Sequence, residues 1–311
     1  MFNAFQLAKT LKKLKLGVIG MSEGNGHPYS WSAIFNGYDK EAMVNCPFPV
    51  IPEYLSREPY PDNYLNILAE VTHIWTQDRK TSERVANASL IKTVCDSIAD
   101  MIGEVDAVLL ARDDAENHYE YAKPFLELGI PIYIDKPFAL NLVDANRLWD
   151  LEKNENQIFS CSALQFAQEF QSSKIDHKKI GEVKAIWATV PKSWEKYAVH
   201  IIEPVLNMLP ERGDLLEALK LPLKSSELRG VQVSWSSGII AQFQSGGNLP
   251  IPLSIKLQGD KGYQELKFQD TFYAFKTALN CFVDIVNGNK YNIPKAFTKE
   301  VVTIIEAGID A

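Results

Sequence analysis

The chain has 311 residues, 46% of them hydrophobic and 23% charged, and a formal net charge of −7 at pH 7. Its length allows two domains, because single hydrophobic cores stop growing near ~250–300 residues. The acidic balance and the scattered lysines and arginines argue against a nucleic-acid-binding protein. No apolar run reaches the ~18 residues of a membrane-spanning helix, so no membrane partner is expected.

The cysteines are far apart in the chain, with no Cys-x-x-Cys pair and no histidine close by; they are Cys46, Cys95, Cys161 and Cys281. This spacing predicts buried free thiols in a reducing compartment, hence a cytoplasmic protein, and neither a disulfide framework nor a bound metal. Lysines among spaced apolar residues over 1–15 predict a short amphipathic helix rather than a targeting peptide.

The first half of the chain alternates predicted strands with predicted helices, which indicates a parallel sheet with right-handed crossovers. We expect strands at 14–20, 71–76, 106–110, 130–135 and 157–163. We expect helices between them at 28–36, 83–101, 117–128 and 142–153.

Residues 37–66 form a long insertion between the first predicted helix and the second strand. They contain five prolines and several aromatic residues. Loops of this length are functional or disordered, and the aromatic residues favour packing. We expect a structural or oligomer-contact element on the side of the sheet away from a cofactor, with a substrate lid as the alternative.

The second half has a different pattern, with strands predicted at 183–190, 230–235, 239–244, 253–258 and 263–268. One helix is expected near 200–208, and two more at 272–286 and 298–308. The pattern predicts an α+β domain built on an open, mainly antiparallel sheet. With a boundary near Leu164, the domains are 1–164 and 165–311.

A glycine-rich turn follows the first strand and opens the first helix, which is the context of a dinucleotide-binding fingerprint. It reads Gly20-Met-Ser22-Glu-Gly24-Asn-Gly26, with serine where the second glycine is expected. Small residues and a helix N-terminus let backbone amides approach a pyrophosphate. The motif is degenerate, so a plain glycine-rich turn is the alternative.

The end of the second strand carries an acidic residue, Asp78, where such folds hold the adenosine ribose of a dinucleotide. Asp78 is far beyond the usual ~20 residues after the glycines, and the insertion at 37–66 accounts for the excess. An aspartate there favours NAD, whereas the neighbouring Arg79 could accept the 2′-phosphate of NADP. The alternative is that Asp78 only caps the following helix.

The strand that ends at Asp135 is followed by Lys136 and Pro137. Its apolar residues do not alternate with polar ones, which is typical of a strand covered on both faces of a parallel sheet. Ligands bind outside the carboxyl ends of such strands, and Pro137 keeps Lys136 extended there. We expect Lys136 to face the ligand; the alternative is a solvated surface lysine.

With Asp135-Lys136-Pro137 in this place, the chain resembles the Gfo/Idh/MocA oxidoreductase family, whose members carry Glu-Lys-Pro at this strand end. Residues 105–113 with His118 are similar to the family's fourth strand and its loop on the nicotinamide side. Residues 180–183 are similar to the start of its C-terminal sheet. The resemblance implies a Rossmann-type doubly wound sheet, an open-sheet second domain, and cofactor contacts at Asp113, His118 and Lys136.

In this family a histidine in an Asp-x-x-x-His pattern acts as the general acid or base, and the resemblance places His200 in that role. Lys196 stands where the aspartate is expected. A lysine there would lower the pKa of His200, because like charge disfavours the protonated imidazole. Residues 196, 200 and 203 share a helix face, so we expect Glu203 to orient His200 instead.

The implied reaction is hydride transfer between NAD or NADP and a sugar, polyol or related cyclic alcohol. His200 would take the hydroxyl proton and Lys136 would donate a hydrogen bond to the same oxygen. Substrate contacts are expected from Gln165, Trp194 and Tyr197. The family also implies a homo-oligomer formed through the C-terminal sheet.

A different class of protein fits part of the pattern. The altered glycine turn and the missing aspartate also suit a non-catalytic NAD(P)-binding sensor or regulatory protein of the same fold. Retained Lys136 and His200 favour the enzyme. Turnover with a panel of sugars separates the two.

Overall fold

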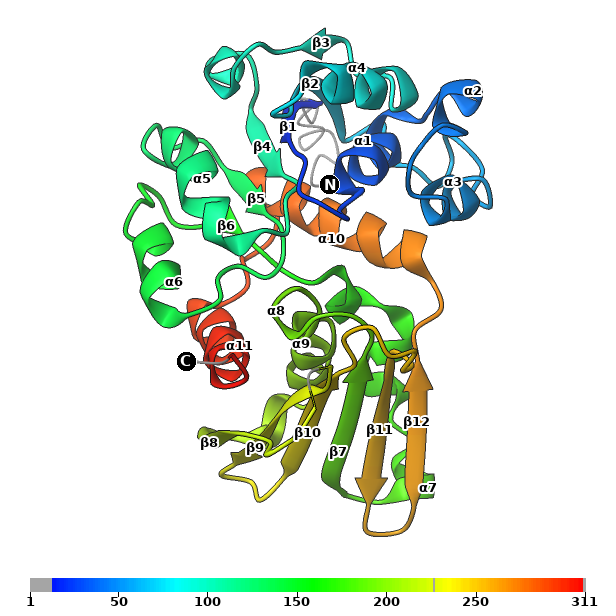
Figure 1. Ribbon diagram of the computed structural model, residues 1–311, viewed down its shortest axis with the longest axis vertical. Coiled ribbons are helices and arrows are strands. Elements are labelled where there is room, and N and C mark those ends of the chain that lie inside the picture. The colour runs from blue at the N-terminus through cyan, green and yellow to red at the C-terminus, as the bar shows by residue number, and fades with distance from the viewer. Residues whose placement is uncertain (1–12, 226, 310–311) are drawn as a thin grey trace, which may run out of the picture.

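Two six-stranded sheets organise the protein, and a computed structural model describes them over residues 13–225 and 227–309 (Figure 1). Most of the amphipathic helix predicted at 1–15 lies outside the described residues. Its residues 14 and 15 belong to the first strand. The Rossmann-type parallel sheet and the second, mainly antiparallel sheet confirm the predicted fold class.

The first sheet is parallel throughout, with the strand order β3-β2-β1-β4-β5-β6. Its strands are β1 (Leu14–Ile19), β2 (Ala69–Trp75), β3 (Thr93–Val94), β4 (Ala107–Leu110), β5 (Ile132–Ile134) and β6 (Ile158–Phe159). The strand order reverses direction between β1 and β4, and such a switch point opens a crevice at the carboxyl ends of the strands.

Helices cover both faces of this sheet, and each face has its own hydrophobic cluster. One face packs on α1 (His27–Asn36), α4 (Arg79–Ala88) and the late helix α10 (Thr271–Val286). The other face packs on α5 (His118–Leu126) and α6 (Leu142–Trp149). The central strands are therefore buried on both sides, which explains their uninterrupted apolar runs.

The helix predicted at 83–101 is wrong in extent. The structure begins α4 at Arg79 and ends it at Ala88, after which Leu90 takes a left-handed φ of 55°. The chain then forms β3, which pairs with β2, and a single 3₁₀ turn at Ile98–Met101. The strand predicted at 157–163 is also shorter, because a 3₁₀ turn at Ala163–Phe166 follows β6.

The second sheet has the strand order β12-β11-β7-β10-β9-β8, and only its β10–β7 pair is parallel. Its strands are β7 (Val183–Val190), β8 (Leu215–Lys220), β9 (Arg229–Trp235), β10 (Ile240–Ser245), β11 (Ser254–Gly259) and β12 (Tyr263–Lys267). The helices before and beside it are α7 (His177–Ile180), α8 (Trp194–Tyr197) and α9 (Val199–Met208). β8 was not predicted. On the face away from α9, Trp187, Ile240 and Tyr263 are exposed.

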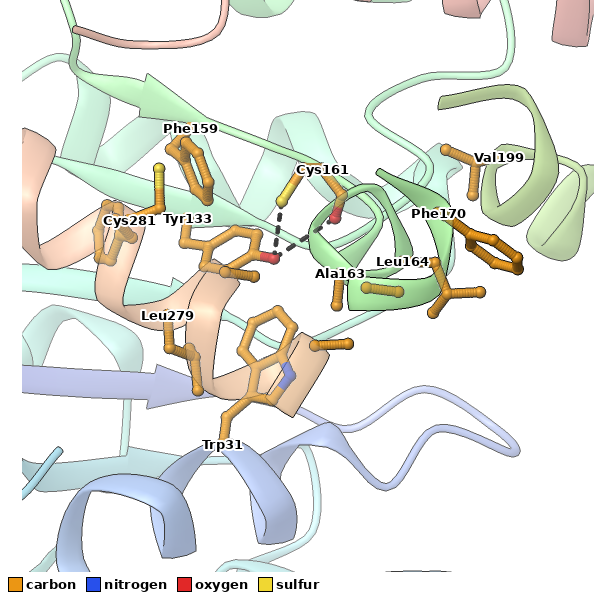
Figure 2. Packing of buried hydrophobic residues seen from close by; sticks show 14 of the residues in the cluster. Trp31, Tyr133, Phe159, Cys161, Ala163, Leu164, Phe170, Val199, Leu279 and Cys281 are labelled. Carbon is orange, nitrogen blue, oxygen red and sulfur yellow. Dashed lines mark hydrogen bonds between the residues drawn. The ribbon is translucent and has the colours of Figure 1, made fainter. Parts of the chain in front are cut away.

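The last two helices return to the first half of the molecule (Figure 1). In α10, Phe282 packs on Tyr133 of β5. Tyr133 also stacks on Trp31 of α1, at 4.6 Å between ring centroids. Figure 2 shows Tyr133 near Trp31 and Phe159, with its hydroxyl hydrogen-bonded to Cys161. α11 (Lys295–Ala307) lies against α6 and β8. The boundary near Leu164 stays a prediction, and residues on both sides of it share one core.

The insertion contains two short helices, α2 (Lys40–Met43) and α3 (Val50–Leu55), and it is packed as predicted. Its Tyr54 stacks on Phe275 of α10. Its expected position away from the glycine turn is wrong, since the Ile51 Cδ1 and Phe48 Cδ2 atoms lie 2.5 and 2.7 Å from where a Cβ on Gly26 would be. Only glycine fits at that contact, so the insertion supports the turn. The four cysteines are free and buried, as predicted.

Candidate active site

The glycine turn between β1 and α1 presents backbone amides without acceptors. Gly24 has a φ of +76°, and a Cβ there would meet no atom within 4 Å, so this side of the turn is open. Within the described residues, the amides of Glu23 and Gly24 have no hydrogen-bond partner. Free amides beside the N-terminus of a ten-residue helix fit a pyrophosphate, so the turn is suited to a dinucleotide.

Ser22 has a defined role at the place of the second glycine. Its Oγ donates to Asp113 Oδ1 at 2.7 Å and accepts from the Asp113 amide at 3.0 Å. Both residues are buried. The serine therefore fixes the glycine turn to the loop after β4. This pairing explains why a side chain is tolerated where the fingerprint expects glycine.

The two residues predicted to select the cofactor have protein partners. Asp78 caps α4 by accepting from the Thr81 amide at 3.0 Å and from the Thr81 hydroxyl, which is the main cause of its lowered pKa. Arg79 pairs with Glu83 and Asp96. The helix-capping alternative for Asp78 is thus observed, and its carboxylate is still exposed at the end of β2.

Gln77, which the sequence did not single out, occupies part of the turn. Its Oε1 accepts from the Met21 amide at 2.9 Å and from Arg112 Nη1 at 3.1 Å. Its Nε2 donates to the Met21 carbonyl. One amide of the fingerprint is therefore already satisfied by the protein. A polar residue at the end of β2 was the only signal available.

His118 does not face a cofactor, which corrects its predicted role. It is fully buried, and its two ring nitrogens lie 2.7 Å from the Arg112 carbonyl and 3.1 Å from the Phe138 carbonyl. These contacts join the loop after β4 to the loop after β5. His118 therefore supports the two loops that carry Asp113 and Lys136.

Asp113 connects the predicted lysine to a second one. Its Oδ2 lies 3.4 Å from Lys136 Nζ, and its Oδ1 lies 2.9 Å from Lys196 Nζ. Burial alone would raise the pKa of Asp113, but Lys136, the Ser22 hydroxyl and Lys196 together hold it well below its usual range. Lys136 is itself only 4% exposed, so the surface-lysine alternative is excluded.

A contact between Asp135 and His27 next to Lys136 was not predicted. Asp135 Oδ2 lies 2.5 Å from His27 Nδ1 and accepts from Asn25 Nδ2 at 2.8 Å. Burial would raise the pKa of Asp135, but His27 and Lys136 lower it. Asp135 therefore ties the strand end to the start of α1. Its partner is distant in sequence, so only the folded chain brings the two together.

The environment of His200 differs from the predicted one. Its Nδ1 lies 2.7 Å from Ser162 Oγ, and no bond to Glu203 exists in the described part of the chain. Glu203 instead accepts from the Ser162 amide at 2.6 Å and from Gln165 Nε2 at 3.0 Å. The expected direct contact is wrong, because both Ser162 groups stand between the two side chains. Glu203 acts on His200 through Ser162.

Burial is the main cause of the pKa shifts in this cluster. It lowers the pKa of His200 well below its ordinary value, and Lys136 adds to the shift. The sequence predicted that Lys196 would lower the pKa of His200. The ammonium of Lys196 pairs with Asp113 instead. Burial also raises the pKa of Glu203, although the Ser162 amide opposes it. The neutral imidazole of His200 is therefore favoured over its protonated form.

The two predicted aromatic contacts behave differently. Trp194 is fully buried and its Nε1 donates to the Ile305 carbonyl at 2.8 Å, so it anchors α11 and is wrong as a substrate residue. Tyr197 lines a cavity of about 460 Å³ at the crevice. The other lining residues are Glu23, Gly24, Asp113, Lys192, Ser193, Lys196, Gly247 and Asn248. Lys192 was missed, since an isolated lysine after a strand gives no signal.

The part of the chain that the structure describes contains no candidate metal site. Across residues 13–225 and 227–309, no three His, Cys, Asp or Glu side chains are grouped to hold an ion. No helix in that same part of the chain is long and apolar enough to cross a membrane.

Sequence comparisons match the first half of the chain to an oxidoreductase family. Residues 14–163 match the sequence model of an oxidoreductase family with an NAD-binding Rossmann fold, GFO_IDH_MocA. An uncharacterised oxidoreductase of Escherichia coli K12, YhhX, is 29% identical over 117 residues, which are 36% of this chain and 34% of that protein. The match thus spans about a third of the curated relative's length.

Solved structures extend the likeness to nearly the whole chain. Myo-inositol dehydrogenase from Lactobacillus casei, in complex with NAD(H) and myo-inositol, is 15% identical with a TM-score of 0.70, over 95% of this chain and 93% of that one. Scyllo-inositol dehydrogenase from the same organism is 13% identical with a TM-score of 0.69, covering 96% and 95%. These identities establish a shared fold. Residues 14–163 thus match the NAD-binding part of this oxidoreductase family, and the chain as a whole shares the fold of the inositol dehydrogenases.

Proposed function

We propose that the protein is an NAD(P)-dependent dehydrogenase that transfers a hydride between the cofactor and a sugar, polyol or related cyclic alcohol. One observation carries the proposal: Lys136 is buried against Asp113 at the carboxyl edge of the parallel sheet, beside the free amides of the glycine turn. Burying a lysine with a single carboxylate partner costs free energy. A charged group kept at such a cost in a cleft is a candidate functional residue. The inositol dehydrogenases of the same fold support the substrate class.

The residues of the first half would hold the cofactor. The amides of Glu23 and Gly24 would bind its pyrophosphate, and the exposed carboxylate of Asp78 would meet its adenosine ribose. When bound, the cofactor supplies the hydride acceptor. Arg79 is engaged by Glu83 and Asp96, which favours NAD over NADP.

The protein's own residues would handle the proton and the oxygen of the substrate. Lys136 Nζ would donate a hydrogen bond to the reacting oxygen and stabilise its negative charge. Neutral His200 would take the hydroxyl proton at Nε2, because Ser162 Oγ engages Nδ1. Glu203 and Gln165 would keep Ser162 in position, and Tyr197 would form the wall of the substrate cavity.

A non-catalytic sensor is the second candidate, and one observation favours it. Gln77 binds both the amide and the carbonyl of Met21, so the turn offers fewer free donors than an unmodified fingerprint. A sensor would bind the dinucleotide without needing Lys136 or His200.

Binding and turnover measured on the same protein separate the two. Titration with NAD⁺ and NADP⁺ is followed by assays with inositols, hexoses and sugar alcohols. For the dehydrogenase, Lys136→Ala lowers kcat about 100-fold or more while cofactor binding persists. Lys184→Ala, at an exposed lysine on β7, is the control and retains activity. Tight cofactor binding without turnover of any alcohol, unaffected by Lys136→Ala, would establish the sensor.

A further inference from the structure

Two lysines and two carboxylates line the cavity at the crevice, and a third lysine lies beside it. Lys192 and Lys196 line it, and Lys136 lies beside it over the ring of Tyr197. The carboxylates on the same wall belong to Asp113 and Glu23. Asp113 is already shared between Lys136 and Lys196. Lys192 is left without a carboxylate partner among the described residues.

The backbone holds Lys192 in place at the mouth of the cavity. Lys192 has a left-handed φ of 66°, a costly conformation for a residue with a side chain. Its carbonyl accepts from the Gly247 amide at 2.9 Å, and the two residues form an isolated bridge. The backbone of Lys192 is thus fixed beside the cavity, and its ammonium is positioned by a hydrogen bond to the Tyr197 hydroxyl.

The ammonium of Lys192 forms a pair of donors with Tyr197. Lys192 Nζ lies 2.5 Å from the Tyr197 hydroxyl and 4.5 Å from the centroid of its ring. An ammonium only donates, so the phenol oxygen is the acceptor and its own proton is free for another acceptor. Two donors side by side match the two oxygens of a carboxylate or a phosphate.

The donor pair lies close to the proposed reaction centre. Lys192 Nζ lies 4.5 Å from the centroid of the Tyr197 ring, and Lys136 Nζ lies 5.1 Å from the same centroid. His200 contacts the ring edge to face at 5.2 Å between centroids. One molecule of sugar size can therefore reach both the donor pair and the reacting groups.

We propose that the substrate is an acidic sugar or polyol derivative whose carboxylate or phosphate binds to Lys192 Nζ and the Tyr197 hydroxyl. This inference rests on the proposed dehydrogenase function and names its substrate class. The negative charge of the bound anion would balance the positive charge of the Lys192 ammonium. Lys196, which also donates to the Glu23 carbonyl at 3.3 Å, would close the side next to the glycine turn.

Matched neutral and anionic probes test the donor pair. Equilibrium binding of glucose, glucuronate and glucose 6-phosphate is measured with cofactor present, followed by turnover of the same compounds. We expect an anionic probe to bind about tenfold or more tightly than glucose, and Lys192→Gln to abolish the difference. Tyr197→Phe keeps the ring and is expected to lose part of the preference. Lys184→Gln is the matched control and keeps all of it.

The outcomes distinguish this inference from the proposed function. Equal binding of glucose and both anions, or equal losses in Lys192→Gln and Lys184→Gln, would overturn the anion site. Weaker cofactor binding by Lys192→Gln, with unchanged discrimination among the sugars, would assign the lysine to the cofactor phosphates and also overturn it. Selective anion binding that depends on Lys192, without hydride transfer from any probe to the cofactor, would leave the site standing and overturn the dehydrogenase.

Discussion

Asp113 is the residue on which the arrangement of the site depends. It accepts from Ser22, Lys136 and Lys196, which come from the glycine turn, the end of β5 and α8. Three segments distant in sequence thus meet at one carboxylate. Replacing it would leave the buried ammonium of Lys136 without a counter-ion, a costly change in a site of low dielectric.

Asp113→Asn is expected to lower the free energy of unfolding by about 3 kcal/mol at pH 7. The pKa of Asp113 is depressed in the folded protein, so its stabilisation is complete above the unfolded value of ~3.9 and is lost as the pH falls toward the folded value. Urea unfolding between pH 3 and pH 7 measures this. The wild type should lose its advantage over the variant only below about pH 4. A constant difference across that range would contradict the assignment.

Ser162 is the residue through which His200 is oriented. Ser162→Ala is expected to lower kcat about tenfold with little change in KM, because His200 Nδ1 loses its partner. The lowered pKa of His200 predicts that the wild-type rate stays level from pH 7 to pH 6, and that the variant changes the acidic limb. Ser32→Ala removes a buried hydroxyl without a partner in the described residues and serves as control. Identical pH profiles for wild type and Ser162→Ala would exclude the role.

At the scale of the element, the turn between β1 and α1 depends on the insertion at 37–66. The rings and methyl groups of that insertion close around Gly26 and leave no room for a Cβ. The sequence indicated packing through its aromatic residues. It could not indicate where, because the contact is made by tertiary structure rather than by local pattern.

Gly26→Ala is expected to cost about 1–3 kcal/mol of stability and to weaken NAD⁺ binding, since its Cβ would overlap Phe48 and Ile51. A double-mutant cycle with Phe48→Ala checks the cause by thermal unfolding and cofactor titration. The cost of Gly26→Ala should shrink in the Phe48→Ala background. Additive losses would show that the insertion does not restrain the turn.

Other elements show where local patterns succeed and fail. β7 was predicted at its observed ends, and the burial of its side chains alternates from Ile186 to Val190. β8 was missed, since its sequence LLEALK suits a helix and its strand state comes from pairing with β9. In the site, the strand-end position pointed to Lys136, whereas the pairing of Asp135 with His27 needed the fold.

At the scale of the whole molecule, no helix or strand among residues 13–225 and 227–309 covers the open face of the second sheet. Trp187 on β7 and Ile240 on β10 are each 40% exposed there, and Tyr263 on β12 is 58% exposed. Large apolar side chains on one sheet face favour contact with another surface. We propose that a second copy of the chain covers this face.

Trp187→Glu is therefore expected to lower the molar mass in solution to that of the single 35.0 kDa chain. Size-exclusion chromatography with light scattering measures it. Glu120→Gln, an exposed change on α5 far from this face, is the control and should leave the mass unchanged. A wild-type protein that is already monomeric would contradict the proposal.

The return of α10 to the first sheet also sets an order for folding during synthesis. Tyr133 and Trp31 (Figure 2) leave the ribosome long before Phe282, which completes their cluster. Until α10 emerges, one face of the nucleotide-binding sheet lacks part of its cover, and exposed strands of this kind attract chaperones and other chains. The nucleotide-binding half therefore matures only after the entire second sheet has been translated.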